Sequence, residues 1–251
     1  MNWEIKDQAI IVTGAGRGLG RAVAELLASC GASVAVCDVD AATCNETVAA
    51  IRKSGSRAAE YAFSVTDRNA FMAAAEEFAR ANGRLDAVVN NAMLLRYEPI
   101  EAVTEAVADQ MLAIGIKGAI WGTQALLAHM DKERGGAIIN MASPVAEKGF
   151  PNTAVYSLVK GALVTLTRTL AAELGPRKVR VNAVAPGSVP TPGALGLNSE
   201  EEYARRTRTI PLRRLGSAED NAQAVAFLLS PAASFINGEI LHVDGGIAAA
   251  G

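Results

Sequence analysis

Histidine and cysteine are scarce in this sequence, and neither forms a metal-binding pattern. The 251 residues include two histidines, His129 and His242, and three cysteines. The cysteines, Cys30, Cys37 and Cys44, lie seven residues apart, which matches neither a CxxC pair nor other spacings of metal ligands. We therefore expect no metal site, and two isolated histidines do not support a Ser-His-Asp hydrolase.

A large net charge and a long apolar run are also absent. Lysine and arginine total 24 against 26 acidic residues, so the formal charge is −2 with neutral histidine. Nucleic-acid-binding proteins usually concentrate a basic excess on one face, and a membrane-spanning helix needs about 20 consecutive apolar residues. Neither pattern occurs, so we expect a soluble protein without nucleic-acid or membrane partners.

The sequence has few features that would separate domains. Low-complexity tracts, blocks of like charge and repeats of fixed period are all missing. We expect a single domain over residues 1–251, because α/β domains reach about 250 residues. Residues 1–12 carry charged residues before a short apolar run, unlike a secretory signal, so we expect a cytoplasmic location.

What the sequence does contain is a regular alternation of short apolar β-branched runs and longer segments of helical spacing. The expected strands cover residues 9–13, 33–37, 58–63, 86–90, 137–141, 179–184 and 240–243. The expected helices cover residues 19–29, 41–53, 68–81, 107–130, 155–174 and 218–229. This order predicts an α/β fold, a doubly wound parallel sheet of about seven strands with helices on both faces. Ligands of such sheets bind at the carboxyl ends of the strands.

A glycine-rich turn follows the first expected strand. Residues 13–20 read Thr-Gly-Ala-Gly-Arg-Gly-Leu-Gly and open a helix, so backbone amides and the positive helix N-terminus can meet a pyrophosphate. Asp38 ends the second strand 20 residues after Gly18 (38 − 18 = 20), the spacing of a carboxylate that binds the adenosine ribose. Together these features predict a dinucleotide site.

Asp38 and Arg17 give opposite indications about the cofactor. A carboxylate accepts hydrogen bonds from ribose hydroxyls and repels a 2′-phosphate, whereas the Arg17 guanidinium beside the turn favours that phosphate. We give more weight to Asp38 and predict NAD rather than NADP.

Three polar residues downstream form a candidate catalytic set. Tyr156 and Lys160 lie four residues apart in a segment of helical pattern, so their side chains share one face. The side chains of Tyr156 and Lys160 can therefore reach one pocket. Ser143 closes an earlier strand 13 residues before the tyrosine (156 − 143 = 13).

In order and spacing these motifs resemble those of the short-chain dehydrogenase/reductase family, and the resemblance covers essentially the whole chain. The matching segments are residues 13–20, Asn90-Asn91-Ala92, Ser143 with Tyr156 and Lys160, residues 182–187, Thr191 and Asp244-Gly245-Gly246. The resemblance implies a Rossmann fold and an NAD(P)-dependent oxidoreductase that acts on alcohols or ketones.

The resemblance also implies a role for each site residue. Tyr156 transfers the proton that accompanies hydride transfer, Lys160 lowers the pKa of that phenol and holds the nicotinamide ribose, and Ser143 bonds the substrate oxygen. The implied cofactor-binding residues are Gly14, Arg17, Gly18, Leu19, Asp38, Ser64, Val65, Asn90, Tyr156, Lys160, Pro186, Gly187, Val189 and Thr191.

Specificity is expected to reside in loops of the same domain. The expected substrate contacts are Ser143, Val145, Phe150 and Tyr156, with Leu94, Leu95, Pro144 and a lid over about residues 190–212 that includes Leu195 and Leu197. These mainly apolar residues predict a hydrophobic or cyclic substrate. Arg205, Arg206 and Arg208 of the lid can bind an anionic group, but a solvated helix with acidic neighbours is the favoured interpretation.

Three positions depart from the family pattern. Gly115 stands in place of an asparagine that, in the family, completes a proton relay through water to the lysine. Met93 replaces the glycine of the Asn-Asn-Ala-Gly element, and Ser64 replaces an acidic residue or asparagine that bonds adenine. Two interpretations of Gly115 stay open. Either backbone or water replaces the asparagine, which is favoured, or catalysis is slowed or specialised.

The leading hypothesis is an NAD-dependent dehydrogenase for a secondary alcohol or ketone. The alternatives are a dinucleotide-binding regulator or scaffold with weak activity, and an NADPH-dependent 3-ketoacyl reductase, against which Asp38 argues. Surplus apolar surface on the helices expected at 107–130 and 155–174 predicts subunit contacts, and the resemblance implies a homotetramer or homodimer.

Overall fold

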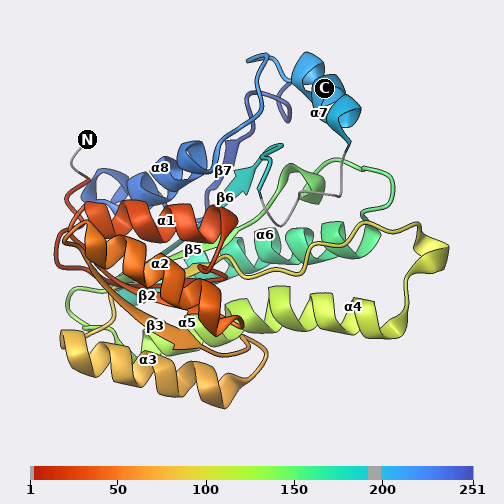
Figure 1. Ribbon diagram of the computed structural model, residues 1–251. Helices are drawn as coiled ribbons and strands as arrows, with labels where there is room; N and C mark the ends of the chain where they lie inside the picture. Colours follow the sequence, from red (N-terminus) through yellow and green to blue (C-terminus); the bar gives the residue numbers. More distant parts are fainter. Residues whose placement is uncertain (1–2, 192–198, 251) are drawn as a thin grey trace.

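Seven parallel strands form one sheet in the residues that the computed structural model describes, 3–191 and 199–250. The strand order is β3-β2-β1-β4-β5-β6-β7 (Figure 1). The strands are β1 (Ala9–Thr13), β2 (Ser33–Asp38), β3 (Arg57–Ala62), β4 (Ala87–Asn90), β5 (Gly136–Met141), β6 (Val179–Pro186) and β7 (Ile240–Val243). Because β1 pairs with both β2 and β4, the winding direction reverses between β1 and β4. The predicted doubly wound α/β fold is confirmed.

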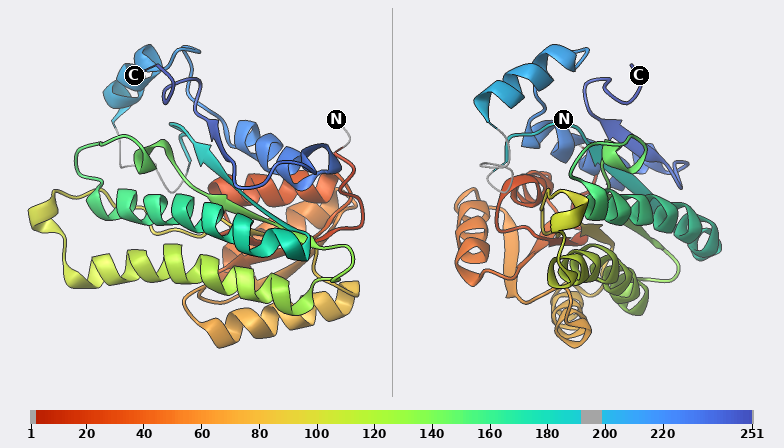
Figure 2. Two further views of the ribbon diagram at one scale, coloured as in Figure 1. Left: turned by 180° about the vertical axis from the view of Figure 1, so that it is seen from behind. Right: turned by 90° about the vertical axis from the view of Figure 1, so that its right-hand side faces the viewer.

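Helices cover both faces of the sheet, as the two views in Figure 2 show. One face carries α1 (Gly18–Ser29), α2 (Ala41–Lys53) and α8 (Ala218–Leu229). The other carries α3 (Arg68–Asn82), α5 (Gly118–His129), which continues α4 (Glu105–Leu112), and α6 (Ala154–Leu174). Helix α7 (Glu200–Thr209) stands beyond the carboxyl end of β6 (Figure 1). It occupies the predicted lid, of which residues 192–198, with Leu195 and Leu197, lie outside the described residues.

The core explains why the strands read as nearly continuous apolar runs. Side chains alternate between the faces of a strand, so Ile10 and Val12 pack with α1, α2 and α8, whereas Ile11 packs with α3 and α5. All five residues of β1 are buried. A parallel sheet covered on both faces has no side that favours polar residues.

The helix expected over residues 107–130 differs in one respect from a continuous α-helix. It begins at Glu105, and a π-helical turn, Ala113–Lys117, joins α4 to α5 with Gly115 buried inside it. π-Helical turns of this kind often occur at functional sites. Periodicity alone does not reveal such a turn, because one wide turn changes the apolar pattern very little.

The combined helix Glu105–His129 has the length and composition of a membrane span, with a mean hydropathy of 1.3 in its most apolar window. In this structure 44% of that window is buried, and the helix packs against α3, β4 and α6. Core helices of α/β proteins can have the same composition, but packing in this structure covers less than half of the apolar window.

The bounds of five strands, β2 to β6, differ from the sequence prediction by one or two residues, because pairing with neighbouring strands sets where a strand begins and ends. β3 covers Arg57–Ala62 rather than 58–63, in register with Ser33–Asp38 of β2. β6 runs two residues past the predicted end at Val184, since Ala185 and Pro186 pair with His242 and Val243 of β7.

A buried polar chain fastens α6 to the centre of the sheet. Asn90 Nδ2 donates to Asn140 Oδ1 at 2.9 Å, and Asn140 Nδ2 donates to Thr167 Oγ1 at 2.9 Å. The Thr167 hydroxyl donates to the Leu163 carbonyl oxygen at 2.7 Å. Since α6 also carries the candidate catalytic tyrosine and lysine, this chain helps to fix their position against β4 and β5.

Replacing Thr167 with valine is expected to lower the free energy of unfolding by about 1–3 kcal/mol, because the buried Asn140 amide loses its acceptor. Thr123→Val in α5 is the matched control, since this buried hydroxyl bonds the Ala119 carbonyl oxygen of its own helix. Urea unfolding of both variants measures the difference. Equal losses would contradict the role assigned to the polar chain.

Candidate active site

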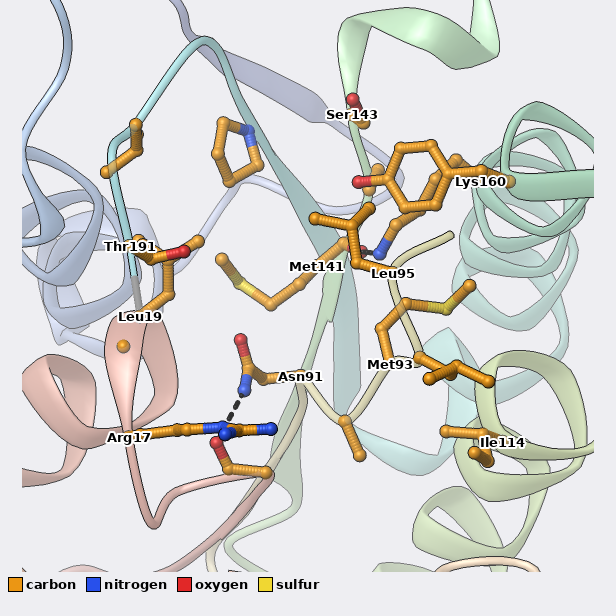
Figure 3. Close-up of a pocket in the computed structure, with 18 of the residues that line it drawn as sticks. Arg17, Leu19, Asn91, Met93, Leu95, Ile114, Met141, Ser143, Lys160 and Thr191 are labelled. Carbon is orange, nitrogen blue, oxygen red and sulfur yellow. Dashed lines mark hydrogen bonds between the residues drawn. The ribbon is translucent and has the colours of Figure 1, made fainter. Parts of the chain in front are cut away.

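A cavity of about 520 Å³ opens at the carboxyl edge of the sheet. Figure 3 shows Arg17 and Leu19 on one side of it, and Ser143 and Lys160 on the other. Of the residues predicted to bind cofactor or substrate, its wall contains Gly14, Arg17, Gly18, Leu19, Asp38, Ser64, Val65, Ser143, Tyr156, Lys160, Pro186, Gly187, Val189 and Thr191. Side chains from segments far apart in the sequence thus meet in one place.

Hydrogen bonds between the end of β1 and the residues after β4 fix the two segments that form the base of the cavity. Asn91 Nδ2 donates to the carbonyl oxygens of Thr13 at 2.9 Å and Gly14 at 3.0 Å. In return, the amides of Asn91 and Ala92 donate to Thr13 Oγ1 at 3.0 and 3.1 Å. The glycine turn is therefore tied to the segment that follows β4.

The glycine turn fits a dinucleotide. Gly14 has a φ of 63°, and a Cβ there would lie 2.9 Å from Ala92 Cα, so only glycine allows this close approach. Arg17, the N-cap residue of α1, makes no side-chain capping bond. The first amides of α1 are left to a ligand, and a phosphate is the group that a helix N-terminus binds best.

Asp38 lines the far end of the cavity from Tyr156. Its Oδ2 accepts from the Gly16 amide at 3.0 Å, which fixes the carboxylate against the glycine turn. Ser64 and Val65 also line this end, where Ser64 Oγ lies 2.8 Å from Thr66 Oγ1. The residues predicted to hold adenosine therefore lie together.

Four predicted residues that the structure describes lie outside the cavity wall, one of them Pro144, which is buried. The Asn90 side chain is turned into the sheet, where it bonds Asn140, and the neighbouring Asn91 lines the cavity instead. Val145 and Phe150 line a separate, shallower hollow on the outside of α6. The short helical turn Pro144–Ala146 begins directly after Ser143 and carries the chain away from the cavity, so these two residues are wrong as wall residues.

Ser143, Tyr156 and Lys160 converge at the inner end of the cavity. Ser143 is 8% exposed at the end of β5, and Lys160 is 4% exposed. Lys160 Nζ donates to the Met141 carbonyl oxygen at 2.6 Å and lies 5.4 Å from the centre of the Tyr156 ring. Figure 3 shows Lys160 reaching toward Met141 beneath Ser143.

Burial controls the titration of this pair. It raises the pKa of the Tyr156 phenol, an effect that Tyr97 increases and the Ser143 hydroxyl opposes. Burial also lowers the pKa of Lys160 to about 8. At neutral pH the Tyr156 phenol is therefore protonated, whereas Lys160, with a pKa of about 8, still carries its positive charge in most molecules. A phenolate at Tyr156 requires further positive charge bound beside it.

The structure adds wall residues that sequence reasoning missed. Tyr97 packs edge-on against Tyr156, with ring centres 5.6 Å apart and planes at 67°. Tyr203, Gln110 and Ile114 also line this part of the cavity, with the expected Leu94 and Leu95. Arg206 lines it too, the one of the three lid arginines considered from the sequence that does so. Helical spacing on α7 could have paired Tyr203 with Arg206, but no local pattern marks Tyr97.

Comparison with known proteins identifies the family. The family profile described as "Enoyl-(Acyl carrier protein) reductase" matches residues 14–248. The chain is 36% identical to 2-(S)-hydroxypropyl-CoM dehydrogenase 3 of Xanthobacter autotrophicus over 254 aligned residues, covering 99% of this chain and 100% of that protein. The chain belongs to the short-chain dehydrogenase/reductase family. It is an NAD(P)-dependent dehydrogenase that acts on CH–OH groups.

Two solved structures extend the comparison within this family. A 7α-hydroxysteroid dehydrogenase complexed with NADH and 7-oxo glycochenodeoxycholic acid has a TM-score of 0.93 and 33% identity, covering 98% of this chain and 96% of that one. A short-chain dehydrogenase from Burkholderia cenocepacia in complex with NADP has a TM-score of 0.89 and 33% identity, covering 98% and 99%. Both forms of the cofactor therefore occur among the structural neighbours.

Two departures from the short-chain dehydrogenase pattern meet in space. A Cβ at Gly115 would overlap Val159 Cγ1 of α6 and would lie 3.1 Å from Met93 Sδ. Figure 3 shows Met93 on the cavity wall between Lys160 and Ile114. Ile114 is the residue immediately before Gly115. Apolar atoms of Val159 and Met93 therefore fill the space beside Gly115, where the family has an asparagine side chain.

Gly115→Ala is expected to destabilise the protein by about 1–3 kcal/mol, because the new methyl group overlaps Val159. Gly161→Ala in α6 is the matched control. A Cβ there has nothing within 4 Å, so loss of glycine should stabilise the helix by about 0.5–1 kcal/mol.

Urea unfolding of both variants, and of Gly115→Ala combined with Val159→Ala, measures these effects. With Val159 shortened to alanine, the methyl group at position 115 should lower the free energy of unfolding much less. A Gly115→Ala variant as stable as the parent protein would refute the packing described here.

Proposed function

We propose that this protein oxidises a secondary alcohol, or reduces the corresponding ketone, with NAD(H) and with Tyr156 as the acid and base. The observation that carries this proposal is the convergence of Ser143, Tyr156 and Lys160 in one cavity that also contains Asp38. No other cluster of polar residues in the described chain is joined to a glycine turn in this way.

Each side chain of the set has a role that its position supports. Ser143 donates to the substrate oxygen and places it beside Tyr156, which removes the hydroxyl proton during oxidation and returns it during reduction. Lys160, anchored on the Met141 carbonyl oxygen, holds its positive charge near the Tyr156 ring. When bound, the nicotinamide supplies the hydride acceptor or donor, and its oxidised ring carries the additional positive charge that favours phenolate.

The substrate end of the cavity contains a group of apolar side chains beside its polar ones. Leu94, Leu95 and Ile114 form much of the wall around Tyr97. Such a wall suits a hydrophobic or cyclic body, because its binding removes apolar surface from water. The likeness to the hydroxysteroid dehydrogenase, which binds a ring system, supports the same substrate class.

Replacing Tyr156 with Phe tests the proposal. This variant should reduce kcat by at least about a hundredfold, since a positioned acid or base contributes about 10²–10⁴. The Kd for NADH should change far less, because the glycine turn and Asp38 are untouched. NADH absorbance with a panel of cyclic, steroid and acyclic secondary alcohols measures the first quantity, and calorimetry measures the second.

The panel also separates the alternative functions. A regulator or scaffold with weak activity would bind NAD while wild type and Tyr156→Phe turn over equally at background. A 3-ketoacyl reductase would reduce an acyl thioester ketone with NADPH in preference to every alcohol tested. Either result would overturn the proposal.

We further propose that NAD is preferred over NADP because of the carboxylate of Asp38, which the Gly16 amide holds at the cavity wall. The aromatic and aliphatic neighbours at this end, Phe63 and Val65, carry no positive charge. Arg17 lines the same cavity, so its guanidinium opposes this preference.

Asp38→Asn should shift the ratio of kcat/KM for NAD to that for NADP toward NADP by about ten- to a hundredfold, the effect of removing roughly 1.4–2.8 kcal/mol of charge repulsion. Asp40→Asn is the control, because Asp40 caps α2 by accepting from the Ala42 amide and does not line the cavity. An unchanged ratio in Asp38→Asn would show that another residue selects the cofactor.

The assembly expected from the apolar helices, a homodimer or homotetramer, stays a prediction. So do the single domain and the cytoplasmic location.

A further inference from the structure

The three arginines of helix α7 are close together in the sequence, but their side chains point in different directions. Arg206 lines the cavity and its side chain is 30% exposed, whereas Arg205, 63% exposed, and Arg208 point to solvent. Tyr203, one turn before Arg206, lines the cavity as well. The inner face of α7 therefore presents one phenol and one guanidinium to the substrate end.

Arg206 spans the mouth of the cavity between two strand ends. Its Nη1 donates to Ser188 Oγ at 3.3 Å, in the loop after β6. On the other side of the cavity mouth, Arg206 lies near Tyr97, in the segment after β4. Burial raises the pKa of the Tyr97 phenol, and the positive charge of Arg206 opposes this rise. Tyr97 in turn packs on Tyr156. The ring of Tyr97 thus lies between the positive charge of Arg206 and Tyr156, the proposed acid and base.

The ion pair on α7 is shared between two arginines. Glu202 Oε1 accepts from Arg206 Nε at 2.8 Å, but the same carboxylate also accepts two bonds from Arg205. The two guanidinium groups lower the pKa of Glu202 to about 2, so it is ionised at working pH. Two guanidinium groups thus share one carboxylate, while Arg206 also lines the cavity, where a ligand can reach it.

We infer that the substrate carries an anionic group at a distance from its carbinol carbon, and that Arg206, flanked by Tyr97 and Tyr203, binds this group. The inference rests on the proposed function and narrows it to an apolar body with an oxyanion at its far end. Carboxylate, sulfonate and phosphate share the chemistry that a guanidinium recognises.

Matched substrates test this inference. The series consists of (ω−1)-hydroxyalkanoates of increasing chain length and 4-hydroxycyclohexanecarboxylate, each paired with its methyl ester, and the corresponding sulfonates and phosphates. With NAD as cofactor, at least one anion should exceed its uncharged partner in kcat/KM by about tenfold or more, the value of a hydrogen bond to a charged group. The spacer of the preferred substrate reports the distance between the carbinol and Arg206, and its head group identifies the anion.

Arg206→Gln should remove most of that preference, and Arg205→Gln is the matched control. Arg205 shares the same Glu202 carboxylate but faces solvent, so its loss should leave the preference intact. Arg206→Lys should keep part of the preference for the anionic substrate. Lysine retains the positive charge but lacks the planar guanidinium that can donate two parallel hydrogen bonds to the anion. Equal effects of Arg206→Gln on each anion and its ester would assign Arg206 a role in lid structure and overturn the inference.

Calorimetric binding of the same anions to wild type and Arg206→Gln in the presence of NADH gives a readout that does not depend on turnover. Tighter binding to wild type is expected, and equal binding would contradict the inference. If the esters are oxidised as well as the anions, the inference fails while the proposed function stands. If nothing in the series or in the alcohol panel is oxidised, the proposed function fails, and the binding data still decide the role of Arg206.

Discussion

The hydrogen bonds between Asn91 and the glycine turn are the constraint on which the site depends. They join β1 to the end of β4, and this pair is where the sheet reverses its winding. A crevice opens at such a reversal because the connections leave in opposite directions. The β1 and β2 side supplies the turn and Asp38, and the β4, β5 and β6 side supplies the chemistry. A shift at this junction would move the two halves of the cavity apart.

The chemistry of the site follows from burial rather than from net charge. Lys160 is buried and Tyr156 is partly buried, and loss of water raises the pKa of the phenol and lowers that of the lysine to about 8. Lys160 is held by a backbone carbonyl oxygen, not by a carboxylate. A positive charge bound beside Tyr156 therefore acts in a medium of low dielectric, where it stabilises a phenolate more strongly than in water. Cofactor binding and proton transfer are linked for this reason.

Two of the departures from the family pattern, Met93 and Gly115, are far apart in the sequence but adjacent in the structure. Met93 and Gly115 lie on different elements, yet the thioether of one occupies space that a side chain at the other would need. A larger residue at 93 and a smaller one at 115 are thus two parts of one packing arrangement, to which Val159 contributes. The result is an apolar surface at this place, since Val159 and Met93 lie where the family has a polar side chain.

The sequence by itself determined the alternation of strands and helices, the glycine turn, Asp38 and the spacing of Ser143, Tyr156 and Lys160. These are local patterns, and parallel topology brings the carboxyl ends of strands together whatever their loops contain. Only the tertiary structure decided that Asn90 faces the sheet, that Val145 and Phe150 leave the cavity, and that Arg206 alone of three arginines on α7 enters it. The direction of each of these side chains depends on contacts between segments far apart in the chain, which no local pattern records.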